Sequence, residues 1–240
     1  MFMLGRFLEV SVHTPDVRAS LAFYESIGFV QATVGEVWTH PYAVVTDGHL
    51  YIGLHGTGIP SPSLTWVRPN LASHVPELEA LGIEFDFARF GEETFHELGF
   101  SDPSGHTITL LEARTFSPLA VGHAPTTSIG YFEEFGLPTT DLDAASAFWD
   151  KLGLVAFDRI REPFPKAVLA GSDINVGLYD LDLRAPVLAF SDPHMSERIA
   201  ALREKGFHFQ SRLPGGLDPR DNAILEAPEG TPLLLMNGSD

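Results

Sequence analysis

Polar and apolar residues alternate along Phe7–His13, and this alternation predicts an extended strand. One face of that strand carries Phe7, Glu9, Ser11 and His13, and the other carries Leu8, Val10 and Val12. Apolar residues then recur at helical spacing from Val17 to Ile27, which predicts a helix with one apolar stripe. Asp16 can cap the start of this helix, and Gly28 can close its end in a left-handed conformation.

The same strand, corner and helix recur 125 residues later, in Phe132–Leu154 (132 − 7 = 125). The matched pairs are Glu9 and Glu134, Asp16 and Asp141, Phe23 and Phe148, Tyr24 and Trp149, and Gly28 and Gly153. A constant offset without gaps is what a duplicated structural unit produces. The pattern therefore predicts two halves with the same fold.

Further alternating and helical segments divide each half into two β-α-β-β-β units. The first unit spans Phe7–His55, and the second contains a helix over Leu71–Leu81. The other half repeats this order, with a helix over Met195–Lys205 and a strand over Phe207–Arg212. Ala113–Thr127 carries two prolines and no sustained periodicity, which indicates a linker. The expected domains are residues 1–115 and 129–240, with 116–128 as the linker between them.

Composition narrows the set of ligands. The chain has 240 residues and a formal net charge of −17, from 32 acidic and 15 basic residues. Such a charge disfavours nucleic acid and anionic membranes, so we expect a neutral or cationic small molecule as the ligand. The absence of cysteine excludes disulfides, thiolate chemistry and Cys-ligated metals. With neither a signal peptide nor an apolar run of about 20 residues, a cytoplasmic monomer or homodimer is expected.

The four units resemble the vicinal oxygen chelate superfamily, which includes glyoxalase I, fosfomycin- and bleomycin-resistance proteins and extradiol dioxygenases. The strongest pieces are DVRASLAFYESIGF over Asp16–Phe29 and FSDPSG over Phe100–Gly105. The resemblance implies an α+β fold of four βαβββ modules, paired into two glyoxalase/bleomycin-resistance/dioxygenase-like domains. Each pair of modules would curl around a cup. In enzymatic members that cup holds a divalent metal (Fe, Mn, Zn or Ni), which chelates two neighbouring oxygens of the substrate.

The metal ligands that the resemblance implies are incomplete in this chain. The first position falls on Glu9 and, in the second half, on Glu134, and both carboxylates can bind a hard metal. The second position falls in Ser61–Thr65 and the third on Thr109, where the chain has neither His nor Glu. The equivalent positions of the second half also lack them. Such a site needs about three protein ligands, so we assign no metal site and keep a divalent metal as the alternative. Glu9 and Glu134 become candidate catalytic groups.

Other side chains are candidates for substrate binding: His13, Trp38, His40, Tyr42, His55, His96 and Thr109. Of these, Trp38, His40 and Tyr42 cluster before and at the start of one strand of the first unit, where they can line a cup. The three lysines, Lys151, Lys166 and Lys205, all fall on segments expected at the surface. The sequence therefore offers no Lys-based nucleophile and no Ser-His-Asp pattern.

Two hypotheses for function remain. One is a divergent enzyme of this superfamily, a lyase, isomerase or dioxygenase, that acts on a small organic molecule in a cup-shaped cavity. The other is a metal-free binding protein that sequesters a drug-like compound, as bleomycin-resistance proteins do. Missing metal ligands and 18 phenylalanines favour the second hypothesis, and the four-unit architecture favours the first.

Overall fold

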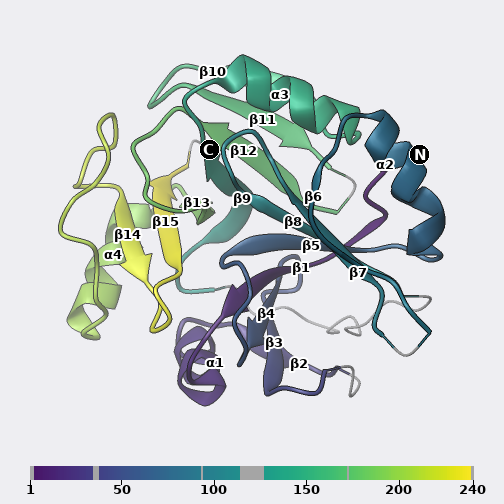
Figure 1. Cartoon of the computed structure of the whole chain (residues 1–240). Helices are drawn as coiled ribbons and strands as arrows, with labels where there is room; N and C mark the ends of the chain where they lie inside the picture. The colour runs from purple at the N-terminus through teal and green to yellow at the C-terminus, as the bar shows by residue number, and fades with distance from the viewer. Residues whose placement is uncertain (1–2, 35–37, 93, 114–126, 172, 239–240) are drawn as a thin grey trace.

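The computed structural model describes residues 3–34, 38–92, 94–113, 127–171 and 173–238. These residues form two mixed β-sheets with helices, an α+β fold, as the repeated units predict (Figure 1). Most of the predicted linker, 116–128, lies outside the described residues, so the division into two domains stays a prediction. No helix in the described ranges is long and apolar enough to span a membrane.

The first half forms an eight-stranded sheet. Its elements are β1 (Arg6–His13), α1 (Val17–Ser26), β2 (Val30–Ala32), β3 (Tyr42–Thr46), β4 (Tyr51–His55), β5 (Ser63–Val67), a 3-10 helix (Leu71–His74), α2 (Val75–Ala80), β6 (Phe85–Arg89), β7 (Glu97–Ser101) and β8 (Thr107–Leu111). The strand order is β2-β3-β4-β1-β5-β8-β7-β6. The two units meet where β1 and β5 pair antiparallel at the centre of the sheet.

The second half repeats this plan in a seven-stranded sheet. Its elements are β9 (Tyr131–Pro138), α3 (Leu142–Lys151), β10 (Val155–Ile160), β11 (Lys166–Ala170), β12 (Asn175–Tyr179), β13 (Val187–Asp192), α4 (Met195–Glu204), β14 (Ala223–Glu226) and β15 (Pro232–Asn237). The strand order is β10-β11-β12-β9-β13-β15-β14. Again the units meet at an antiparallel pair, here β9 and β13.

One predicted strand, Phe207–Arg212, is wrong. In this segment only Phe209 forms a bridge, with Leu225 of β14. The segment stays beside β14 through backbone bonds such as that from Gln210 N–H to the Ile224 carbonyl. With one bridge and a few backbone bonds, the segment lies as a loop along the edge of the sheet.

The predicted helix ends are confirmed in both halves. The Asp16 carboxylate accepts hydrogen bonds from the backbone N–H groups of the first turn of α1, at 3.0 and 3.1 Å. Asp141 caps α3 in the same way, at 3.1 and 2.9 Å. After the helices, Gly28 and Gly153 adopt φ values of 103° and 95°, which favour glycine. The chain therefore turns back toward each sheet at the same point in both copies.

A single apolar core joins the two halves, because the helices lie between the sheets. Phe29, after α1, contacts Phe190 of β13, with ring centroids 6.2 Å apart. On the other side, Trp149 of α3 lies 6.5 Å from Trp66 of β5. Figure 1 shows the purple-to-blue first half at the lower right and the green-to-yellow second half at the upper left. The opposite face of each sheet is left free to form a cup.

The alternation predicted for β1 fails at its start. The register shifts between Phe7 and Glu9, so Leu8 is an extra residue in the pairing with β5. Phe7 therefore packs in the core, with its ring centroid 5.3 Å from that of Trp66. Leu8 packs instead with Leu111 on the other face. Phe7 thus does not share a face with Glu9, which corrects the sequence-based prediction.

Replacing either capping aspartate tests the duplication energetically. We expect Asp16→Ala and Asp141→Ala each to lower the free energy of unfolding by about 0.5–2 kcal/mol, because each leaves N-terminal N–H groups without an acceptor. Urea unfolding followed by circular dichroism measures the change. Asp16→Asn is the control and should lose less, since Asn also caps well; equal losses for Asn and Ala would contradict the capping role.

Candidate functional site

Glu9 is fully buried on β1, and three side chains donate hydrogen bonds to its carboxylate. Tyr42 Oη donates to Oε2 at 2.5 Å, while His55 Nε2 and Ser11 Oγ donate to Oε1 at 2.7 and 3.0 Å. Gly53 of β4 makes this arrangement possible, because a Cβ there would lie 2.2 Å from the carboxyl carbon of Glu9. The glutamate thus lies across its own sheet, over a glycine.

His55 connects this buried carboxylate to His40. The Nδ1 atom of His55 lies 3.0 Å from Nε2 of His40. A carboxylate only accepts hydrogen bonds, so a neutral His55 that donates to Glu9 through Nε2 accepts from His40 at Nδ1. That pattern leaves Nδ1 of His40 as a lone-pair acceptor. Glu9, His55 and His40 therefore form a chain of polar groups that ends at the imidazole of His40.

Burial shifts two pKa values along this chain. Burial lowers the pKa of His40, and the neighbouring imidazole of His55 acts in the same direction, although Glu9 acts in the opposite direction. Burial, together with the charge of Glu9, raises the pKa of Tyr42 well above its ordinary value. Tyr42 thus stays a hydroxyl donor at neutral pH, and His40 stays a neutral base.

A cavity of about 510 Å³ opens above these groups. Its polar lining includes hydroxyl and imidazole groups, from Ser11, Ser63, Thr65, Thr109, His40 and His55, together with the ion pair of Arg89 and Glu97. Its aromatic walls are Trp38, Phe87 and Phe95. The Trp38 ring contacts both imidazoles, with centroids 5.2 Å from His40 and 5.3 Å from His55. An aromatic molecule with hydrogen-bonding groups along one edge fits such a lining.

The structure brings together some of the predicted residues and separates others. Trp38, His40, His55 and Thr109 line the cavity, and Tyr42 contacts Glu9 behind it. His13 points elsewhere: its Nδ1 lies 2.6 Å from the carbonyl oxygen of Thr57. His96 contacts Glu112, and the resulting hydrogen bond raises the pKa of His96. Neither His13 nor His96 is among the cavity-lining residues.

Sequence reasoning missed part of the lining. Phe87 reaches the cavity because Gly99 lies under its ring, where a Cβ would come within 2.2 Å. Ser11 and Thr65 were also missed as a pair, although their hydroxyl oxygens are 2.7 Å apart across β1 and β5. A glycine opposite an aromatic residue in paired strands was the available signal for Phe87. It depends on strand register, which the sequence does not supply.

The residues present do not fit the three-ligand metal site that the resemblance implies. Glu9 pairs with Thr65 across β1 and β5, and Thr65 pairs with Thr109 across β5 and β8. The three expected ligand positions thus form one row, in which two members are neutral hydroxyls. No group of three His, Asp or Glu residues within the described ranges could hold a metal ion. A divalent ion needs a stronger set of protein ligands than this row offers.

The second half builds a different cluster around its own glutamate. Glu134 is buried, and its Oε1 accepts from Lys166 Nζ at 2.6 Å and from Tyr179 Oη at 2.8 Å. Lys166 also contacts Glu133 at 3.2 Å. The expectation of a surface position for Lys166 is wrong: a register shift beside Ala189 turns both glutamates toward the same face, and the lysine is buried against them.

Burial and charge act against each other in this ion pair. Burial raises the pKa of Glu134, and Lys166 opposes that shift without cancelling it. Burial alone would lower the pKa of Lys166, but the charges of Glu134 and Glu133 outweigh it and raise that pKa. Apolar side chains close the cup around this cluster: Phe164, Val187, Ala189, Leu217, Ile224, Leu234 and Met236. The second cup is therefore filled where the first is open.

The comparisons with known proteins support the fold. No protein-family model and no characterised protein sequence matches the chain. Among solved structures, it superposes on a catechol 2,3-dioxygenase with a TM-score of 0.60 at 15% identity, covering 98% of this chain and 88% of that one. It superposes on 2,2',3-trihydroxybiphenyl 1,2-dioxygenase from Sphingomonas wittichii with a TM-score of 0.60 at 18% identity, covering 98% of this chain and 91% of that one. For homoprotocatechuate 2,3-dioxygenase from Arthrobacter globiformis the TM-score is 0.59 at 15% identity, and the match covers 98% of this chain and 80% of that one.

These similarities show that the chain has the fold of two-part extradiol dioxygenases over nearly its whole length. The predicted fold class is thereby confirmed. At 15–18% identity they show the fold alone, and what those proteins act on is a property of those proteins.

Removing Lys166 from the second cluster should strongly destabilise the folded protein. We expect Lys166→Met to lower the free energy of unfolding by about 3–5 kcal/mol, because it leaves Glu134 buried without its countercharge. Thermal and urea unfolding measure the loss. The double variant Lys166→Met with Glu134→Leu should recover most of it, since no buried charge then remains. A double variant as unstable as the single one would show that the ion pair itself, rather than the unpaired charge, determines the cost.

The lowered pKa of His40 predicts how stability depends on pH. In the unfolded chain His40 binds a proton near its ordinary pKa of 6.5, whereas the folded protein binds it only at lower pH. The unfolded state then holds more protons below about pH 6.5, so acidification favours unfolding. Relative to His40→Asn, the wild type should lose stability as the pH falls from 7.5 to 5. Urea unfolding at several pH values measures this difference, and a constant difference would contradict it.

Proposed function

We propose that this protein is a divergent member of the vicinal oxygen chelate superfamily that acts on a small aromatic molecule in the first-half cup. The observation that carries the proposal is the cavity of about 510 Å³, in which aromatic walls face a polar chain ending at His40. The ligand class follows from this lining: a neutral aromatic ring with a hydroxyl or similar acidic group. The cytoplasmic location expected from the sequence stays a prediction.

His40 is the proton acceptor in this proposal, and Glu9 and His55 are its positioning residues. Glu9 is buried beneath His55 and does not line the cavity, so it acts through the imidazoles. When His40 takes a proton from the ligand at Nδ1, the positive charge is stabilised through His55 by the carboxylate. His40 is neutral at pH 7 because burial lowers its pKa. A group held neutral beside a buried carboxylate is suited to general-base chemistry.

A second candidate function is ligand binding without chemistry, as in a drug-sequestering protein. The donor set favours it, because Thr65 and Thr109 occupy positions where the metalloenzymes of the superfamily need ligands. In that case the hydroxyls of Ser11 and Thr109 orient the ligand, and the His40 imidazole only accepts a hydrogen bond. The two candidates share the cavity and differ in whether a proton moves to His40.

Titration with 4-nitrophenol tests both candidates in one measurement. Trp38 is the one tryptophan in the cavity, since Trp66 and Trp149 are core residues, so a bound aromatic ring should quench its fluorescence. If His40 accepts the phenol proton, the visible absorbance of 4-nitrophenolate should rise on binding at pH 6, where the free phenol is largely neutral. A phenol that quenches Trp38 without this absorbance supports the binding function.

Matched variants make the assignment specific. His40→Asn should keep the fluorescence quench, because the aromatic walls remain, and should lose the phenolate absorbance. Trp38→Phe should keep the absorbance and lose the quench. No quench by 4-nitrophenol, catechol or phenol would reject the first cup as an aromatic site. A phenolate signal unchanged in His40→Asn would reject His40 as the proton acceptor.

A further inference from the structure

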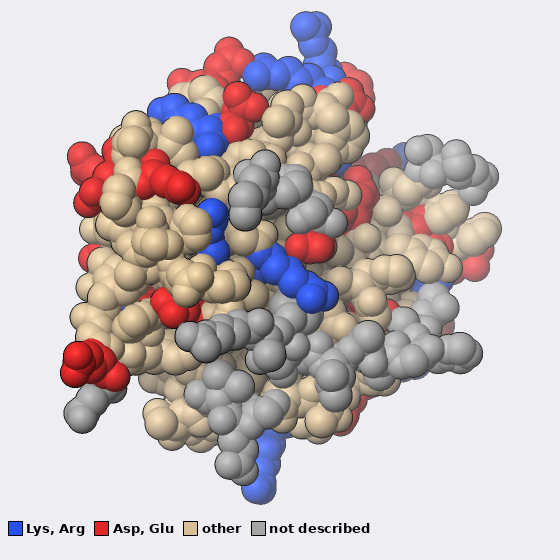
Figure 2. Space-filling model, turned by 90° about the vertical axis from the view of Figure 1, so that its right-hand side faces the viewer, with Lys and Arg blue, Asp and Glu red and all other residues tan. Residues whose placement is uncertain are grey.

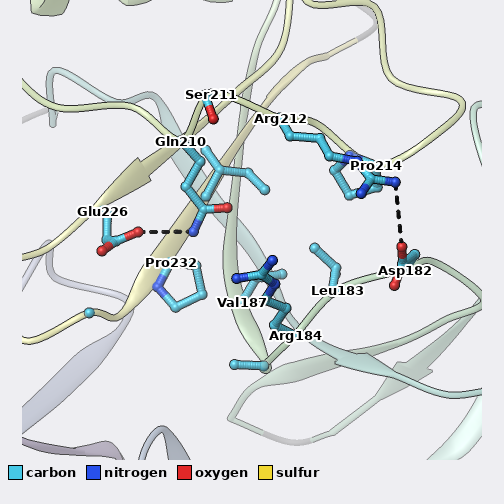
Figure 3. Close-up of a pocket in the computed structure, with 13 residues that line it drawn as sticks. Asp182, Leu183, Arg184, Val187, Gln210, Ser211, Arg212, Pro214, Glu226 and Pro232 are labelled. Atoms are coloured by element: carbon cyan, nitrogen blue, oxygen red, sulfur yellow. Dashed lines mark hydrogen bonds and ion pairs between the residues drawn. The ribbon is translucent and has the colours of Figure 1, made fainter.

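The second half has a cavity of its own, at the edge of its filled cup. It encloses about 500 Å³ between the loop after β12, the loop after α4 and the ends of β14 and β15 (Figure 3). Val187 and Ile224, which belong to the apolar filling of the cup, form part of its wall. Glu134 and Lys166 do not line it. This cavity is therefore separate from the first-half cup and from the buried ion pair.

Two arginines line this cavity, together with two acidic residues, Asp182 and Glu226. Arg184 and Arg212 both line it, and both are exposed. In Figure 3, Arg212 lies beside Asp182 on one side, Glu226 lies on the opposite side, and Arg184 lies between them. Basic residues are few in this chain, 15 against 32 acidic ones, and on the face shown in Figure 2 they are interspersed among acidic groups. Two guanidinium groups at one cavity are thus an uncommon local arrangement for this protein.

Both arginines are available to a ligand. Arg212 contacts Asp182 at 3.8 Å, with both side chains about 85% exposed (85% and 86%), so water weakens this pair and the guanidinium can turn to a better partner. Arg184 makes no hydrogen bond or ion pair with other described residues. A planar guanidinium binds a carboxylate through two parallel hydrogen bonds, a geometry that a lysine does not offer.

The rest of the lining fixes which way a ligand lies. Glu226 on the far side accepts a hydrogen bond from Gln210 Nε2 at 3.1 Å, and its negative charge repels a second carboxylate there. Beside Arg184, the part of the wall between Arg212 and Glu226 is formed by apolar residues such as Val187, Ile224 and Pro232. A ligand with one anionic end and one apolar body matches this order of groups.

We propose that this cavity binds a small organic carboxylate, with its carboxylate on Arg184 and Arg212 and its apolar body on Val187, Ile224 and Pro232. The site is distinct from the first-half cup, so it stands whether or not that cup processes an aromatic molecule. It also extends the ligand range expected from the net charge, which favours neutral and cationic molecules, to one class of anion.

Calorimetric titration of the full chain with 1-naphthylacetate tests this site. We expect saturable binding that weakens at least tenfold in Arg184→Ala and at least threefold in Arg212→Ala, whose guanidinium already has a partner. Lys205→Ala is the matched control, because it removes one positive charge at the end of α4, outside the cavity. It should bind as the wild type does. Equal weakening in Lys205→Ala would show a general charge effect and overturn the site.

Two further measurements separate this cavity from the first one. The neutral amide 1-naphthylacetamide has the same apolar body, so it should bind at least tenfold more weakly if the carboxylate is recognised; equal binding would overturn the ligand class. The fluorescence of Trp38 reports on the first cup and should stay unchanged when the carboxylate binds. Binding that quenches Trp38 and is unaffected by Arg184→Ala would place the carboxylate in the first cup and reject the proposal.

Discussion

A carboxylate buried on the central strand is the constraint around which each half of this protein is built. A charge inside the protein is stable only when hydrogen bonds or a countercharge replace the water it has lost. In the first half Glu9 receives three donors, from Tyr42, His55 and Ser11. Those donors come from three neighbouring strands, β3, β4 and β1. The position of the glutamate thereby orients one side chain on each of these three strands.

The duplicated half meets the same constraint with different chemistry. Strand registers place Lys166 where the first half has Tyr42, and Tyr179 where it has His55. A lysine neutralises its glutamate outright, so the second cluster needs no outer histidine. Tyr42 donates one neutral hydrogen bond, so in the first half the negative charge extends its influence to His55 and then to His40. The substitution of one neighbour thus separates a closed ion pair from a cluster that we propose takes up a proton.

Much of the fold could be predicted from the sequence because it depends on local and repeated signals. The caps at Asp16 and Asp141, the left-handed Gly28 and Gly153, and the order of four units all follow from spacing. The predictions that were wrong concern the pairing between strands. The shift that moves Phe7 into the core, the missing strand after α4 and the burial of Lys166 each depend on register, which a single sequence does not encode locally.

The candidate site was predictable only in part for the same reason. Aromatic and histidine residues near Tyr42 indicated a cup lining, and Trp38, His40 and His55 do line the cavity. The partners of Glu9 could not be derived, because Tyr42 and His55 lie 33 and 46 residues from it along the chain. Neighbouring side chains across strands, such as Thr65, become visible only when the sheet is assembled.

The placement of the helices explains how the two cups could diverge. Since the shared apolar core lies between the sheets, each cup occupies the face of its sheet that points away from the other half. Replacing the hydroxyl row of Thr65 and Thr109 by Ala189 and Leu234 fills the second cup without touching that core. A change of lining in one cup therefore leaves the packing of the other cup nearly unchanged. One duplicated fold can in this way keep an open polar cavity in one half and place a cavity lined by two arginines at the edge of the other.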